Sequence, residues 1–180
     1  MQRQLFLTGD VNLMNVEDPR APFARAAGTL RAADFLFGNL ECCLYTPPAE
    51  RSPGDEGFYA PPAAGEALAL AGYHAVGTAN NVNYGPEAIA HSLRELDRLG
   101  IAHTGSGANH AAAHAPAIVA RKGMRFGILQ RTSVYWPTNH EAGEHSAGVA
   151  VIRGHTAYQL PLHKTRPEVP PANRPGVPPV

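Results

Sequence analysis

Three short apolar segments of the chain each end in a small residue followed by side chains that carry oxygen. They end in Thr8-Gly9-Asp10, Gly38-Asn39-Leu40-Glu41 and Thr78-Ala79-Asn80-Asn81. If the segments are parallel strands, their carboxyl ends meet at one edge of a sheet, where open α/β sheets bind ligands. Carboxylate and amide oxygens suit Mg²⁺ or Mn²⁺, and added imidazole suits a mixed two-metal site. The pattern therefore predicts a divalent-metal site at that edge.

The same residue types also have a purely structural use. Asp and Asn frequently cap helices and turns, because their short side chains accept hydrogen bonds from nearby backbone N–H groups. Asp10, Asn39, Asn80 and Asn81 all fit that description. The pattern alone leaves both interpretations open.

A polar loop at residues 138–145 offers a second group of candidates. It contains two histidines and two glutamates, and we take His140 and His145 as candidate catalytic groups. Just before it, Arg131, Tyr135 and Trp136 have the charge and the aromatic rings to hold an anionic or sugar-like substrate. A solvated loop is the alternative.

Two further patterns are weaker. His110 and His114 stand one helical turn apart, but no glutamate follows His110 to act as a general base, so we interpret them as ordinary helix surface. Gly105-Ser106-Gly107 follows a strand and precedes a helix, as phosphate-binding glycines do, yet the third glycine of the dinucleotide fingerprint is missing. A tight turn is the preferred interpretation, and a nucleotide-binding domain is a weaker alternative.

Strands and helices alternate along the chain. Strands are expected at residues 5–7, 35–37, 75–78 and 101–104, and helices at 20–33, 63–71 and between Gly85 and Gly100, with Gly100 as a cap. A brief helix follows near 109–114, then two strands at 117–120 and 124–129 joined by a turn at Lys122-Gly123, and a last strand at 149–152. Such alternation predicts an α/β fold with a largely parallel sheet flanked by helices.

The last twenty residues differ in composition from the rest. Residues 161–180 contain seven prolines, which cannot donate ladder hydrogen bonds. We therefore divide the chain into a domain at residues 1–155 and a proline-rich tail or linker at 156–180, and expect the tail to add little to the core.

Composition narrows the class of protein. The 180 residues are 44% hydrophobic and 17% charged, which is typical of a globular domain. Fifteen basic and fifteen acidic residues cancel, so nothing predicts binding to nucleic acid. The two adjacent cysteines, Cys42 and Cys43, are expected to be small apolar residues without a disulfide. With no leader or membrane segment in sight, the expected location is the cytoplasm.

Several motifs resemble the CapA family of capsule and poly-γ-glutamate synthesis proteins, which is related to the calcineurin-like metallophosphoesterases. The similar segments are Gly-Asp-Val-Asn-Leu-Met at 9–14, Asn-Leu-Glu at 39–41, Ala-Asn-Asn at 79–81 and Gly-Ile-Ala-His-Thr-Gly-Ser-Gly at 100–107. Their order and spacing over residues 4–133 make the resemblance specific to the amino-terminal part of that family.

The resemblance implies a metallophosphoesterase-like layered α/β domain and a divalent metal, in some relatives dinuclear, such as Mn, Mg or Fe/Zn. It implies Asp10, Glu41 and Asn80, helped by Asn81, as metal ligands, and an anionic polymer or a phosphoester as substrate. Two departures matter. Val82 stands where the family has a histidine, and the family's later Ser-His-Trp-Gly motif is absent. We therefore expect the isolated chain to hydrolyse phosphoesters poorly. The alternative function is that of a non-catalytic module that binds an acidic polymer or a phosphorylated ligand.

Overall fold

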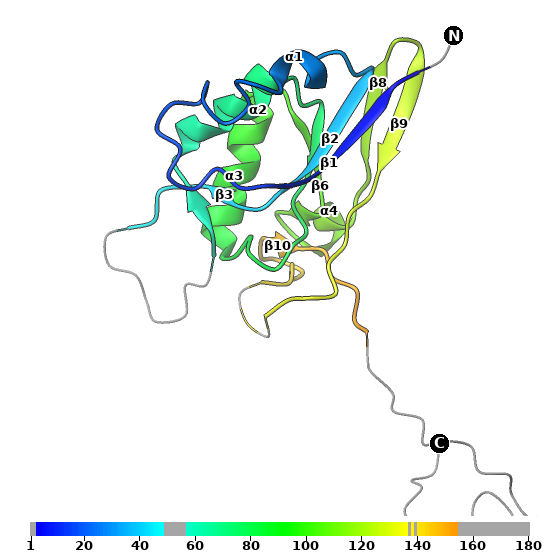
Figure 1. Cartoon of the computed structure of the whole chain (residues 1–180). Helices are drawn as coiled ribbons and strands as arrows, with labels where there is room; N and C mark the ends of the chain where they lie inside the picture. The colour runs from blue at the N-terminus through cyan, green and yellow to red at the C-terminus, as the bar shows by residue number, and fades with distance from the viewer. Residues whose placement is uncertain (1–2, 49–56, 137, 139, 155–180) are drawn as a thin grey trace, which may run out of the picture.

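The computed structural model describes residues 3–48, 57–136, 138 and 140–154. Its centre is a parallel sheet of four strands in the order β1-β2-β5-β6 (Figure 1). These strands are β1 (Leu5–Val11), β2 (Phe35–Leu40), β5 (Ala75–Gly77) and β6 (Ala102–Thr104). The α/β class and the parallel sheet expected from the sequence are thereby confirmed, and each of the four expected strands is present.

Helices connect the parallel strands and cover one face of the sheet (Figure 1). They are α1 (Ala27–Leu30), the 3₁₀ helix η1 (Pro62–Gly65), α2 (Glu66–Ala71) and α3 (Pro86–Arg98). Helix α3 starts with a proline in its first turn, and Gly100 follows it with a φ of 69°, a left-handed value that favours glycine. Both ends of α3 therefore lie where the sequence predicted them.

The helix expected at residues 20–33 is wrong in extent. Only Ala27–Leu30 is helical, and a chain of turns precedes it. The Asp18 carboxylate accepts a hydrogen bond from the Arg20 backbone N–H at 3.0 Å, which favours a turn over a helix. From this segment, Phe23, Leu30 and Ala33 contact the core, and two of the three lie outside residues 27–30 and the third at their last position, so tertiary contacts do little to extend the helix.

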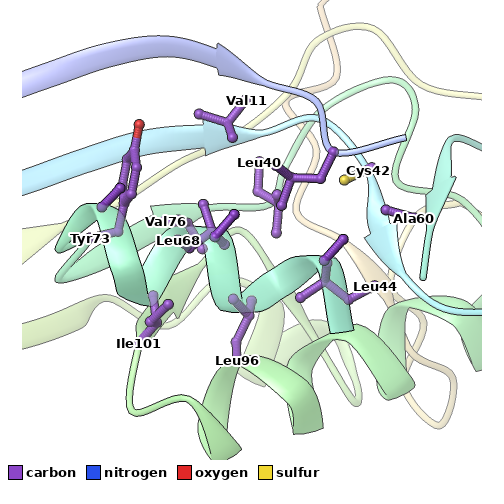
Figure 2. Packing of buried hydrophobic residues seen from close by; sticks show 14 of the residues in the cluster. Val11, Leu40, Cys42, Leu44, Ala60, Leu68, Tyr73, Val76, Leu96 and Ile101 are labelled. Carbon is purple, nitrogen blue, oxygen red and sulfur yellow. The ribbon is translucent and has the colours of Figure 1, made fainter. Parts of the chain in front are cut away.

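The main hydrophobic core lies between the sheet and the helices (Figure 2). Leu36, Leu40 and Val76 from the strands meet Leu68 of α2 and Leu96 of α3 there, and all five are almost fully buried. Cys42 is free and buried beside them, Cys43 is free and buried in a second cluster with Ile89 and Val149, and burial raises the pKa of the Cys42 thiol to about 11. Both cysteines are thus structural apolar residues, as predicted.

A β-hairpin covers part of the opposite face of the sheet (Figure 1). Its antiparallel strands are β8 (Ala117–Arg121) and β9 (Met124–Ile128), and Phe126 stacks on Phe35 of β2 with ring centroids 4.5 Å apart. The turn residues Lys122 and Gly123 have φ values of 47° and 79°, as a two-residue hairpin turn requires. The hairpin carries the residues that follow it back to the carboxyl edge of the sheet.

Short elements complete the domain. β3 (Cys43–Leu44) pairs with β4 (Tyr59–Ala60), and β7 (Ser106–Gly107) pairs with β10 (Gly148–Val149). The strand expected at 149–152 is therefore shorter and shifted. Helix α4 (His110–Ala113) packs so closely on β7 that a Cβ on Gly107 would lie 2.3 Å from the Ala113 nitrogen. This close packing agrees with the tight turn preferred for Gly105-Ser106-Gly107.

Two further expectations concern the proline-rich tail and membrane-spanning segments. The proline-rich tail at 156–180 lies outside the described residues. Within the described part of the chain, no helix is long and apolar enough to cross a membrane.

Candidate functional site

The carboxyl ends of β1, β2 and β5 lie side by side because the strands are parallel and adjacent. Asp10 of β1 is in register with Asn39 of β2, and Asn39 is in register with Gly77 of β5. The pairing of β1 and β2 is irregular between Leu7 and Asp10, which places Asp10 directly opposite Asn39. Of the side chains predicted to meet at this edge, those of Asp10, Asn39, Glu41 and Asn80 are joined by hydrogen bonds, whereas Asn81 takes part through its backbone.

Asn39 is the centre of the cluster. Its Nδ2 donates to the Asp10 carboxylate at 2.8 Å and to the Glu41 carboxylate at 3.4 Å. One amide group therefore lies within hydrogen-bond distance of two acidic side chains. Its carboxamide nitrogen points at the carboxylates, so its oxygen points away from them.

The other end of Asn39 is fixed by two donors. Its Oδ1 accepts from Gln130 Nε2 at 2.8 Å and from Asn80 Nδ2 at 3.2 Å. Gln130 Oε1 in turn accepts from the Ala79 backbone N–H at 2.8 Å. Gln130 is a site residue that the sequence reasoning missed. The available signal was its position, a polar side chain directly after the strand expected at 124–129.

Asn80 is both a member of the cluster and a cap. Its Oδ1 accepts from the backbone N–H groups of Val82 and Asn83 at 3.2 and 3.0 Å, and its Nδ2 donates to the Leu40 carbonyl at 2.8 Å. The capping interpretation thus holds for Asn80. Because its oxygen is already engaged with the backbone, Asn80 as placed stabilises the loop rather than presenting an oxygen toward Asp10 and Glu41.

The electrostatics of the cluster favour a bound cation. Burial raises the pKa of Glu41 above its ordinary value, the negative charge of Asp10 raises it further, and the Asn39 hydrogen bond lowers it. A divalent cation between two hard oxygen donors would relieve that repulsion. Among the described residues, however, no three His, Cys, Asp or Glu side chains form a complete metal cluster. A cation bound here would have the carboxylates of Asp10 and Glu41 as its protein ligands, and the described residues do not form a complete two-metal set.

Comparison with known proteins identifies the family of the chain. Residues 4–169 match the family described as bacterial capsule synthesis protein PGA_cap. The chain belongs to the PGA_cap family. Two proteins of Sinorhizobium fredii (strain NBRC 101917 / NGR234), the uncharacterized proteins y4sH and y4uA, are each 32% identical over 145 residues. That alignment covers 73% of this chain and 31% of each relative, so the chain spans about a third of their length.

In this PGA_cap chain, His140 is buried away from solvent and held at both ring nitrogens. Its Nε2 donates to the Asn80 carbonyl at 3.0 Å, and its Nδ1 accepts from the Trp136 backbone N–H at 2.9 Å. Since Nδ1 accepts, the ring is neutral. His140 therefore attaches the 132–145 loop to the Asn80 loop, and as placed it has no nitrogen available for substrate.

His145 and Asn81 are placed differently. The His145 side chain is 89% exposed and lies 3.9 Å from the Glu144 carboxylate. In the described structure neither His140 nor His145 bonds to Asp10 or Glu41. The Asn81 carbonyl accepts from the Trp136 indole N–H at 3.0 Å, so its backbone anchors Trp136.

The predicted substrate-binding residues have three different environments. Arg131 donates to the carbonyls of Gln130 and His114, both at 2.7 Å, so its guanidinium is largely committed to the backbone. Tyr135 packs half-buried against the cluster formed around Ile89 and Val149. Trp136 is 40% exposed, which leaves part of the indole ring accessible for stacking. Of the three, Trp136 is best placed to contact a ligand.

The neutral histidines predict a pH dependence of stability. Burial lowers the pKa of His140 and of His74, whose Nδ1 accepts from the Leu36 N–H at 2.9 Å. Between these lowered values and about 6.5, the unfolded chain binds more protons than the folded chain. We therefore expect the free energy of unfolding to be nearly constant between about pH 7 and 8 and to fall as the pH drops below about 6.5. Urea unfolding at pH 7.5, 6.5 and 5.5 measures this, and a chain more stable at pH 5.5 than at 7.5 contradicts it.

Proposed function

We propose that this PGA_cap domain takes part in capsule or poly-γ-glutamate polymer assembly by binding a divalent cation at Asp10 and Glu41. The observation that carries the proposal is the convergence of both carboxylates on the Asn39 amide at the carboxyl edge of the sheet. Mn²⁺ or Mg²⁺ fits this donor set best, because both prefer oxygen ligands.

The bound cation would attract the anionic group of a ligand and supply Lewis-acid polarisation of a phosphoryl or carboxylate oxygen. Asp10 and Glu41 hold the cation, and Asn39 orients the two carboxylates as their shared donor. Trp136 offers a partly exposed ring beside Asn81 for the non-charged part of the ligand. The ligand class is therefore an acidic polymer or a phosphorylated precursor of one.

The arrangement supports ligand binding better than rapid hydrolysis. Val82 occupies the position of the family's histidine, and its apolar side chain neither donates a proton nor stabilises developing charge. His140 does not replace that histidine, since the backbone engages both of its ring nitrogens. Losing one donor of this kind lowers a rate by about 10²–10³.

Metal-dependent phosphoester hydrolysis on a metallophosphoesterase-like fold is the second candidate. The raised pKa of Glu41 favours it, because perturbed carboxylates are common in catalytic sites. It also agrees with the parallel sheet whose carboxyl edge carries the acidic residues.

The test is the thermal shift that Mn²⁺ produces in the native chain and in Asp10→Asn. A ligand at 100 times its Kd adds about 2.7 kcal/mol, which for a chain of this size raises Tm by about 5–10 °C. We expect that shift in the native chain and its loss in Asp10→Asn and Glu41→Gln. The shift, not the absolute Tm, is the readout, because removing either charge also relieves repulsion in the metal-free protein.

Asp97→Asn is the matched control, since the Asp97 side chain is 72% exposed and pairs with His103 on the surface. An Mn²⁺ shift that persists in Asp10→Asn, or no shift in the native chain, contradicts the proposal. Hydrolysis of an aryl phosphate assayed in parallel separates the two candidates. Turnover that disappears in Asp10→Asn supports hydrolysis, and a metal shift without turnover supports the binding function.

A further inference from the structure

A hollow of about 870 Å³ opens on the surface between α4 and the loop that follows His140. His110 and His114 lie on the α4 side, and Glu141 and Glu144 lie on the loop side. The hollow shares no lining residue with the Asp10–Asn39–Glu41 cluster. Ligand binding at the carboxylate cluster therefore does not account for this hollow.

The two histidine rings in this hollow are stacked on each other. Their centroids are 4.1 Å apart and their planes differ by 22°, as expected for residues four apart on one helical turn. Two nitrogens bound to one tetrahedral ion at about 2.0–2.1 Å lie about 3.4 Å from each other. The in-plane lone pairs of both rings must converge on one ion, so binding requires the two rings to turn about their side-chain bonds out of the stacked arrangement.

Hydrogen bonding assigns the tautomer of His114. Its Nδ1 lies 2.9 Å from the His110 carbonyl oxygen. A carbonyl only accepts, so Nδ1 carries the proton, and in the neutral ring Nε2 keeps its lone pair. A histidine that donates one ring N–H to a carbonyl while the other nitrogen faces outward is the usual arrangement of a metal ligand. No hydrogen bond to another described residue engages the ring nitrogens of His110.

The backbone that carries the pair is held on several sides. The His110 N–H donates to the Gly143 carbonyl at 2.6 Å, and Arg131 donates to the His114 carbonyl at 2.7 Å. The Asn109 side chain caps α4 by accepting from the Ala112 N–H at 2.9 Å. These contacts hold the backbone of the two residues one helical turn apart before any ligand binds, so the entropy cost of chelation is mainly that of ordering the two side chains.

The facing carboxylates have different roles. Glu141 is paired with Arg153 at 2.9 Å, so its charge is largely neutralised. The Glu144 side chain is 88% exposed, and its charge raises the local concentration of cations at the hollow. Because no three His, Cys, Asp or Glu side chains form a complete cluster among the described residues, the histidines would be the protein ligands and water would fill the other positions.

We propose that His110 and His114 bind one borderline divalent cation, Zn²⁺, Ni²⁺ or Cu²⁺, as a two-histidine chelate at this hollow. Imidazole nitrogens suit these ions, whereas Mg²⁺ and Mn²⁺ prefer oxygen. The site differs in both place and metal preference from the carboxylate cluster, and it does not depend on the proposed function.

Equilibrium dialysis of the untagged full chain against Zn²⁺ and Ni²⁺ tests the proposal, with Mn²⁺ present in excess to occupy the carboxylates. We expect one ion to bind at micromolar concentration. His110→Ala and His114→Ala should each weaken that binding at least roughly tenfold, since each leaves a single imidazole. Cu²⁺ should bind more tightly than Zn²⁺, following the usual order of affinities. His103→Ala is the control, because His103 pairs with Asp97 away from the hollow.

Circular dichroism checks that each variant folds. If an alanine variant does not fold, His110→Gln or His114→Gln replaces it. Binding that is unchanged in both histidine variants overturns the proposal. So does binding that is lost in Asp10→Asn, which would assign the ion to the carboxylate cluster. Absence of Zn²⁺ and Ni²⁺ binding at millimolar concentration overturns it as well.

Discussion

Replacing His140 with alanine is expected to lower the free energy of unfolding by roughly 2–4 kcal/mol. The ring is fully buried, so its loss leaves a cavity. It also leaves the Asn80 carbonyl and the Trp136 N–H without their partner. Those two groups belong to different loops, so the substitution separates the 132–145 loop from the loop that follows β5. Urea unfolding followed by circular dichroism at pH 7.5 measures the loss.

Two variants control this experiment. His145→Ala removes a histidine from the same loop, but its side chain is 89% exposed, and we expect a change within about 0.5 kcal/mol. His140→Gln keeps one donor and one acceptor and should recover part of the loss. Equal stability of His140→Ala and His145→Ala would contradict the structural role and would return His140 to the list of candidate catalytic groups.

The regular elements could be predicted because local sequence signals agree with the tertiary fold. Pro86 at the start of α3 and Gly100 after its end determine that helix, and Lys122-Gly123 determines the hairpin turn. The helix expected at 20–33 failed because alanine-rich composition indicated a helix where few side chains contact the core. Short strands such as β7 and β10 depend on pairing between distant segments, which local sequence does not reveal.

Part of the candidate site could also be predicted from the sequence. Asp10 and Glu41 were identified because polar residues at the ends of neighbouring parallel strands must meet. The two roles of Asn39 and Asn80 were left open, since an asparagine that caps a turn and one that binds a ligand look alike in sequence. Gln130 was missed because it reaches the site from a hairpin on the far face of the sheet, 91 residues from Asn39 along the chain.

Replacing Gln130 with leucine is expected to weaken Mn²⁺ binding at the proposed carboxylate site by about 10–100-fold, the usual effect of losing a residue that orients metal ligands. Leucine is similar in size to glutamine but has no polar group. The Asn39 Oδ1 would lose its 2.8 Å donor, and the Ala79 N–H would lose its acceptor. The Asn39 carboxamide would then be free to turn, and the carboxylates of Asp10 and Glu41 would lose their shared donor. Gln4→Leu is the matched control, because it makes the same change at an exposed position.

A second readout separates orientation from a general loss of structure. The Asn39 hydrogen bond lowers the pKa of Glu41, whereas burial and Asp10 raise it. If Gln130→Leu loosens Asn39, the pKa of Glu41 should rise further, and protons should compete with Mn²⁺ at a higher pH than in the native chain. Titration of the Glu41 side chain by NMR measures this even in the absence of metal. An unchanged Glu41 titration in a folded Gln130→Leu variant would show that Asn39 holds its orientation without Gln130, because its contact with Asn80 would then be sufficient.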